Sequence, residues 1–124
     1  LKSIMNFILV FIGGGFGSLL RYQIGLWLQK NSASLPWATF AANVCACVIF
    51  ALTLWLCSFK IVNQSTLKLL LITGFCGGLS TFSSFGYETF LLFKQSLHLY
   101  AVLNIVLNTA TCILIFYLLS NKLF

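Results

Sequence analysis

Long stretches without charged side chains constrain this chain more than any other feature. The stretch Leu35–Phe59 contains no acidic or basic residue, and Ile4–Leu28, Leu69–Phe93 and His98–Leu119 contain no more than one each. A helix needs about 20 mostly apolar residues to cross the hydrocarbon core of a bilayer. The sequence therefore predicts an all-α integral membrane protein, with four transmembrane helices in a single domain over residues 1–124.

The overall composition excludes a soluble fold and a nucleic-acid partner. Only 6% of the 124 residues are charged, whereas a soluble domain carries about 25% charged residues. The net charge of +6 comes from seven cationic residues that are scattered singly, so no basic stripe is present to follow a phosphate backbone. We expect a lipid bilayer as the surroundings, and a first stretch that spans it rather than a cleavable signal peptide.

Three short polar connections, Gln29–Ser34, Lys60–Thr66 and Lys94–Leu97, join the four stretches. Short connections force neighbouring helices to run antiparallel, so both termini are expected on one side of the membrane. The lysines at the two sides differ little in number: Lys2, Lys60, Lys68 and Lys122 lie on the side of the termini, and Lys30 and Lys94 lie on the other. Since loop lysines set orientation, this weak bias predicts insertion in both directions and an antiparallel, dual-topology homodimer.

Groups suited to catalysis are almost absent from the sequence. It has one acid, Glu88, and one histidine, His98, and the run Gly13–Gly17 lacks the lysine of a phosphate-binding loop. The spacing of Gly13 and Gly17 favours close helix packing in lipid over a ligand role. We expect no enzymatic activity.

Five cysteines all fall inside the predicted spans: Cys45, Cys47, Cys57, Cys76 and Cys112. Their spacing fits no common metal motif. They are interpreted as small buried packing residues rather than as redox or metal-binding groups.

The third stretch carries glycines and hydroxyl residues where a lipid-facing helix would carry aliphatic ones. Gly74, Gly77 and Gly78 are followed by the hydroxyl residues of Ser80–Ser84. This pattern suits a helix broken at mid-membrane, whose freed backbone groups need protein, water or an ion as partners. A flexible packing segment, in which serine and threonine bond back to their own helix, is the alternative.

Helical spacing beyond the predicted break separates a polar face from an aromatic one. Thr81, Ser84 and Glu88 share one face, and Phe82 and Phe85 share the next. Phenylalanine rings carry a positive edge. Two rings presented edge-on can line a path for a small anion without trapping it.

Other predicted spans supply matching polar groups. Thr39 and Asn43 lie one helical turn apart on the second span, and the fourth carries Tyr100, Asn104, Asn108 and Thr111 on one face. Amide and hydroxyl donors can replace the water around an anion without binding it irreversibly. Arg21 either attracts anions to an entrance or extends to the lipid headgroups. Because four helices cannot easily enclose such a path, an oligomer is favoured.

These residues resemble the bacterial fluoride channel family, often called Fluc or CrcB, over essentially the whole chain. The resemblance rests on the run Gly13–Tyr22, on Thr39 followed four residues later by Asn43, and on Gly74–Phe85 followed by Glu88. It implies a channel in the bacterial plasma membrane that exports fluoride passively. It also implies an antiparallel homodimer with two pores.

Individual roles follow from the resemblance alone. A structural sodium ion on the dimer axis would be held by the backbone carbonyls of Gly77 and Ser80. Phe82 and Phe85 match the pore phenylalanines, and Arg21 matches an arginine at the aqueous vestibule. The other residues expected along the fluoride path are Asn43, Ser84, Thr39, Glu88, Asn104 and Asn108.

Two departures from the family pattern are visible. Trp37-Ala38-Thr39 stands where Gly-Thr-Leu is common, and Ala46 or Cys47 replaces a glycine. Some members carry a pore tyrosine where Asn104 aligns. These differences bear on conduction rate and helix spacing.

Two other functions compete with fluoride conduction. A small multidrug exporter is also a four-span antiparallel dimer, but it needs a carboxylate in its first span, where this chain has Arg21 and no acid. A non-transporting assembly subunit would rely on glycine-mediated helix packing and would conduct nothing.

Overall fold

The computed structural model describes residues 1–28, 35–59 and 63–123, with side chains through Leu119. Three long helices are continuous: α1 (Lys2–Leu28), α2 (Trp37–Ser58) and α6 (His98–Leu123). The remaining span is a composite of four segments: α3 (Gln64–Leu67), the π-helix η2 (Lys68–Cys76), α4 (Gly77–Leu79) and α5 (Phe82–Lys94). The described residues thus contain four helical stretches long and apolar enough to cross a membrane, as predicted.

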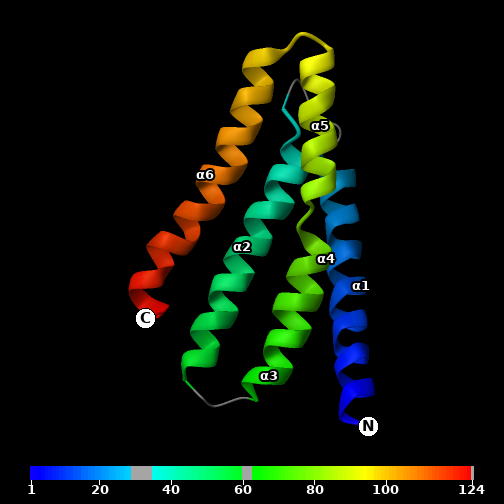
Figure 1. The fold of residues 1–124 in the computed structure, drawn as a ribbon, viewed down its shortest axis with the longest axis vertical. Coiled ribbons are helices and arrows are strands. Elements are labelled where there is room, and N and C mark those ends of the chain that lie inside the picture. Colours follow the sequence, from blue (N-terminus) through cyan, green and yellow to red (C-terminus); the bar gives the residue numbers. More distant parts are fainter. Residues whose placement is uncertain (29–34, 60–62, 124) are drawn as a thin grey trace.

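The four spans alternate in direction (Figure 1). α1 and the composite third span run one way, and α2 and α6 run the other, so the N-terminus and the end of α6 lie at the same end. The connection between α5 and α6 is short, and its Ser96 has a positive φ of 62°. The predicted connection Gln29–Ser34, and residues 60–62 of the next one, lie outside the described residues. So do Lys30, Lys60 and the side chain of Lys122, on which part of the charge comparison rests.

Glycines bring α1 against the third span without intervening side chains. A Cβ on Gly13 or Gly17 would overlap the carbonyl oxygen of Leu70 or of Phe75, respectively, and one on Gly78 would overlap Gly14. Backbones approach this closely only where no side chain lies between them. The packing interpretation of the glycine run is therefore confirmed.

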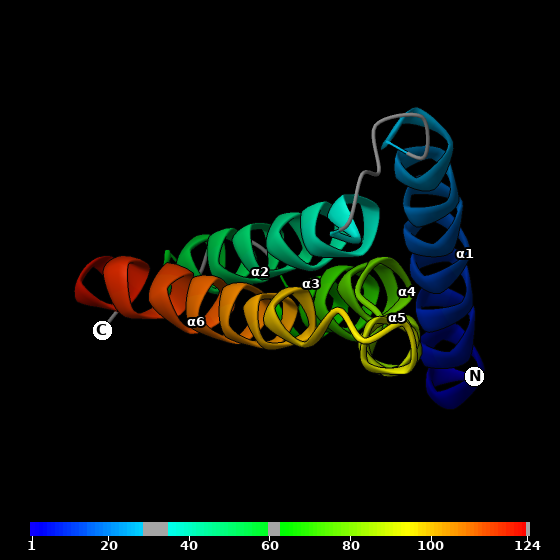
Figure 2. The ribbon, with the colours of Figure 1, turned by 90° about the horizontal axis from the view of Figure 1, so that it is seen from above.

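The core lies where α1, α2 and the third span meet. Its buried residues are Ile24, Ala42, Ala46, Cys76 and Leu79. Figure 2 shows α2 and α6 running side by side, whereas α1 leans in a different direction and splays away from both. Large apolar side chains stay exposed on the splayed faces, as lipid surroundings allow.

The third span is broken near its middle, as predicted. α4 ends at Leu79, and the two residues that follow have extended backbones, with ψ of 154° at Ser80 and 115° at Thr81. The helix resumes at Phe82, where the Thr81 side chain accepts a hydrogen bond of 3.2 Å from the Ser84 N–H. A side-chain acceptor at this position is a standard N-terminal cap. The break therefore has its own local stabilisation.

Candidate functional site

The break exposes backbone groups of opposite polarity at mid-span. In a continuous helix the Thr81 N–H would donate to the Gly77 carbonyl and the Ser84 N–H to the Ser80 carbonyl. Here the Thr81 N–H donates to Asn43 Oδ1 at 2.9 Å, and the Ser84 N–H donates to Thr81 Oγ1. The carbonyls of Gly77 and Ser80 thus lose their helical donors. Negative carbonyl ends close one half-helix, and the positive N-terminus of α5 opens the next.

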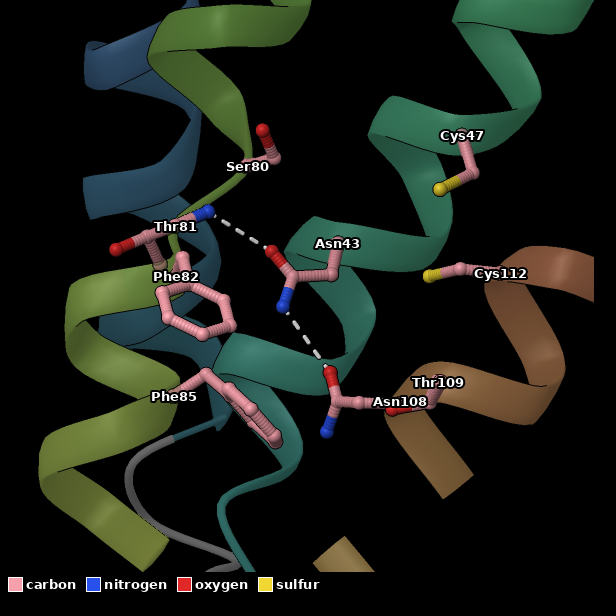
Figure 3. Close-up of a pocket in the computed structure, with 9 residues that line it drawn as sticks. All are labelled: Asn43, Cys47, Ser80, Thr81, Phe82, Phe85, Asn108, Thr109 and Cys112. Atoms are coloured by element: carbon pink, nitrogen blue, oxygen red, sulfur yellow. Dashed lines mark hydrogen bonds between the residues drawn. The ribbon is translucent and has the colours of Figure 1, made fainter. Parts of the chain in front are cut away.

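Asn43, on α2, is hydrogen-bonded both to the break and to α6. Its carbonyl oxygen accepts the Thr81 N–H, and its amide nitrogen donates to Asn108 Oδ1 on α6 at 3.0 Å. Figure 3 shows the two bonds in series, from the third span through α2 to α6. One side chain thereby fixes the relative positions of three spans.

Buried amides continue this series along α6 and back to α5. Asn108 Nδ2 donates to Asn104 Oδ1 at 3.0 Å, and Asn104 Nδ2 donates to Thr89 Oγ1 at 2.8 Å. The Thr89 hydroxyl donates in turn to the Phe85 carbonyl. Thr89, Asn104 and Asn108 are all buried. Because an unpaired polar group in such surroundings costs folding free energy, the hydrogen bonds among them stabilise the fold.

A cavity of about 260 Å³ opens beside the break. It is lined by residues of the third span, α2 and α6: Asn43, Cys47, Ser80, Thr81, Phe82, Phe85, Asn108, Thr109 and Cys112 (Figure 3). The rings of Phe82 and Phe85 lie 5.7 Å apart between centroids, tilted by 48°. The two phenylalanines and Asn43 are thus brought together, as predicted.

A second cavity of about 380 Å³ lies among α1, the start of α2 and α5. Its lining includes Arg21, Thr39, Thr81, Ser84 and Glu88. Thr81, Ser84 and Glu88, predicted to share one helix face, thus line the same cavity. Thr81, at the break, lines both cavities.

Glu88 is bound on one oxygen only. Thr39 Oγ1 donates to Glu88 Oε1 at 2.7 Å, whereas the buried Oε2 has no hydrogen-bond partner within the part of the chain that the structure describes. Thr39 is thus the side chain that holds Glu88 in place at the edge of this cavity.

The predicted site residues divide between the two cavities and the amide network. Asn43, Phe82, Phe85 and Asn108 line the first cavity, and Arg21, Thr39, Ser84 and Glu88 line the second. Asn104 lines neither cavity and serves instead as a link between Thr89 and Asn108. Tyr100 and Thr111 line neither cavity.

Sequence reasoning missed three residues of the first cavity: Thr109, Cys47 and Cys112. Cys47 follows Asn43, and Cys112 follows Asn108, by one helical turn, so helical spacing contained the signal. Cys57 and Cys76 are buried, as expected for packing residues, but Cys45 is exposed and Cys47 and Cys112 are half-buried. The prediction of five buried cysteines was wrong because Cys45 lies on an exposed face of α2, and because Cys47 and Cys112 line a cavity rather than a filled core.

Comparison with known proteins identifies the family. A family model described as "CrcB-like protein, Camphor Resistance (CrcB)" matches residues 8–119. The "Fluoride-specific ion channel FluC" of Serratia proteamaculans is 41% identical over 82% of this chain and 80% of its own length. The protein of the same name from Methanocaldococcus jannaschii is 38% identical over 92% of this chain and 90% of its own.

A third relative extends the pattern. The "Fluoride-specific ion channel FluC 1" of Yersinia pseudotuberculosis is 44% identical over 82% of this chain and 80% of its own length. These relatives are named as channels and not as enzymes, in keeping with the scarcity of catalytic groups. The family match spans most of the chain, and the relatives cover more than two thirds of it. The chain therefore belongs to the CrcB family of multi-pass membrane proteins.

Proposed function

We propose that this chain forms a passive, fluoride-selective channel. The observation that carries the proposal is that two cavities are both lined by Thr81, which caps the positive N-terminus of α5 at mid-span. Relatives at about 40% identity are named fluoride-specific ion channels. Such a channel lets a cell vent fluoride that enters as the neutral acid and dissociates inside.

The chemistry of the two cavities suits an anion that must pass without being trapped. Phe82 and Phe85 offer ring edges and Asn43 offers an amide, none of which carries a full charge. At the other end of the path, Arg21 lines the second cavity and raises the local anion concentration. The donors replace the water of hydration, and the absence of a cation among the residues lining the first cavity keeps binding weak enough for release.

A second copy of the chain completes the structure in this proposal. The accessible surface of one copy is 8232 Å², about a quarter above the roughly 6,600 Å² that its mass predicts for a compact protein. Phe82 is 84% exposed although it lines the cavity. The Gly77 carbonyl has also lost its helical donor, and lipid cannot replace one. Partners for these groups favour a dimer.

The orientation of that dimer rests on the weak lysine bias. A chain with little preference inserts both ways, which produces an antiparallel pair with a copy of the path in each subunit. Two pores per dimer follow from this symmetry. A reporter fused to the C-terminus is expected on both sides of the membrane, and its detection on one side alone would refute the antiparallel arrangement.

A sodium ion fits the break as a structural cofactor. Carbonyl oxygens are the ligands that a dehydrated hard cation prefers, and Gly77 and Ser80 carry carbonyls freed from their helical donors. Two copies that meet at this surface would contribute both pairs. The ion would neutralise the carbonyl dipoles at the bilayer centre and hold the copies together.

The function is tested with purified protein in liposomes loaded with fluoride, with release followed by a fluoride electrode. We expect fluoride release and no matching release of chloride. Replacing Phe82 or Phe85 by isoleucine removes a ring edge worth about 1 kcal/mol, so the flux is expected to fall about fivefold while the dimer stays intact. Equal chloride release, or no release, contradicts the proposal.

The sodium proposal is tested by purifying and reconstituting the protein with potassium as the only cation. Loss of dimer on size exclusion, restored by added sodium, is the expected result. Equal dimer content in both salts contradicts a structural sodium ion.

A further inference from the structure

Cys47 and Cys112 face each other across the first cavity. Their side chains extend toward one another from α2 and α6 (Figure 3). Both line the cavity and both are half-buried, so they are reachable from it. Neither thiol has a role in the proposed fluoride path.

The polar network holds the two thiols in place. Asn43 and Asn108 are hydrogen-bonded at 3.0 Å across the same pair of helices. Cys47 and Cys112 lie one helical turn beyond these two residues, so the bond between the amides fixes the helix spacing at the level of the thiols. Two thiol ligands on rigid, facing helices form a preorganised chelate.

We propose that Cys47 and Cys112 form a binding site for a soft monovalent metal ion of the Cu(I) and Ag(I) class. Thiolate sulfur selects soft ions over the hard sodium and magnesium ions that are abundant around a cell, and two sulfurs suffice for an ion that accepts linear coordination. Each thiol releases its proton to water as its sulfur binds the ion. One bound monovalent ion and two thiolates leave a net charge of −1 where the empty site was neutral.

Metal binding here would inhibit the channel, a consequence that rests on the proposed function. The ion would share a cavity of about 260 Å³ with Asn43, Phe82 and Phe85. The added negative charge repels an approaching anion in a poorly screened setting. Fluoride flux is therefore expected to fall at least tenfold when the site is loaded.

Binding is tested first, independently of transport. Purified protein in detergent and chloride-free buffer receives silver nitrate together with a monothiol competitor, and silver retained after gel filtration is measured by mass spectrometry. A chelating pair outcompetes a single thiol by roughly a hundredfold. The wild type is therefore expected to retain one ion per chain, and its free thiols titrated with a disulfide reagent are expected to fall by two.

Variants then locate the ion. Cys47→Ser and Cys112→Ser are expected to retain at least tenfold less silver. Cys45→Ser is the matched control, because Cys45 lies on the same helix and is exposed. Undiminished retention in Cys47→Ser or Cys112→Ser overturns the site, and so does a wild type that keeps no silver. The thiol titration of the wild type decides the matter even if a variant does not fold.

Silver is finally added to the fluoride liposomes, and each variant is compared with its own untreated rate. The wild type and Cys45→Ser are expected to slow at least tenfold and to recover with excess dithiol. Silver retention without slowing overturns the inhibitory role. Wild-type liposomes that release no fluoride before silver is added refute the proposed function, and the retention result then stands by itself in support of the site.

Discussion

The contact between α1 and the third span offers a sharp test of the fold. Gly17 is buried, and a Cβ placed on it would overlap the Phe75 carbonyl oxygen and would lie 2.8 Å from the Leu79 nitrogen. Both atoms belong to the backbone, so they cannot rotate away as a side-chain tip could. Gly17→Ala must therefore push α1 and the third span apart just before the break.

The expected loss of stability follows from two opposing effects. Overpacking of a rigid contact costs about 3 kcal/mol at the upper end of the usual range, while alanine in a helix interior gains about 1 kcal/mol over glycine. Gly17→Ala is thus destabilised by about 2 kcal/mol. A Cβ added at Gly15 would meet no atom within 4 Å, so Gly15→Ala is expected to be stabilised by the gain in helix propensity alone, about 1 kcal/mol. The two variants should differ by about 3 kcal/mol.

Both variants are compared in one detergent, with thermal unfolding followed by tryptophan fluorescence. Gly17→Ala should unfold at a lower temperature than the wild type, and Gly15→Ala at a higher one. The control separates overpacking from any general effect of alanine in α1. If Gly17→Ala is as stable as Gly15→Ala, the close backbone contact between α1 and the third span is refuted.

Four further predictions concern the hydrogen bonds of the site. Asn43→Ala leaves the Thr81 N–H without its partner and should cost about 1–3 kcal/mol in unfolding free energy, with a fall in fluoride efflux; unchanged stability would contradict the bonding between α2 and the break. Asn43→Asp keeps the acceptor for Thr81 but loses the donor to Asn108 and adds a negative charge. Stability should fall by about 1–3 kcal/mol and efflux at least as far as in Asn43→Ala, and the same two assays measure both. Thr39→Val removes the hydroxyl that donates to Glu88 and should destabilise the protein by about 1–3 kcal/mol. Glu88→Gln retains an acceptor for Thr39 and should change stability by less than about 1 kcal/mol, and a larger loss would point to a second partner for Glu88.

The break in the third span was predictable because its signal is local. Gly77 and Gly78 lower helix propensity, and the hydroxyl of Thr81 supplies the cap that starts the next helix. All three residues lie within five positions of one another, so no knowledge of other helices is needed. The close approach of Gly13 and Gly17 to a neighbour was predictable for the same reason, although the identity of the neighbour was not.

The assignment of polar residues to separate cavities was not predictable from spacing. Asn104 and Asn108 share one face of α6, and spacing alone treats them alike. The structure turns Asn108 toward Asn43 and the cavity, and it ties Asn104 to Thr89 within the buried network. That difference depends on where α5 crosses α6, which is a tertiary property.

The cysteines also show that spacing alone does not predict which residues line a cavity. Cys45 and Cys47 are two residues apart on α2, yet one is exposed and the other lines a cavity. The sequence contains the one-turn relation between Asn43 and Cys47, and likewise between Asn108 and Cys112. The sequence does not show that α2 packs beside α6. That packing is what brings Cys47 and Cys112 to the same cavity.

The bonds of Asn43 bear on how so few charges could support the proposed anion path. A broken helix in lipid leaves N–H and carbonyl groups that each cost several kcal/mol if unpaired. The side-chain oxygen of Asn43 accepts a hydrogen bond from the Thr81 N–H at the break, and its amide nitrogen donates to Asn108. The break is therefore stabilised by a neutral side chain. A lysine or an aspartate there could satisfy a backbone group as well, but its charge would bind the passing anion or repel it. In the proposed channel, a neutral amide at this position would keep the break stable and leave the anion free to move, so the residue type would matter as much as its place.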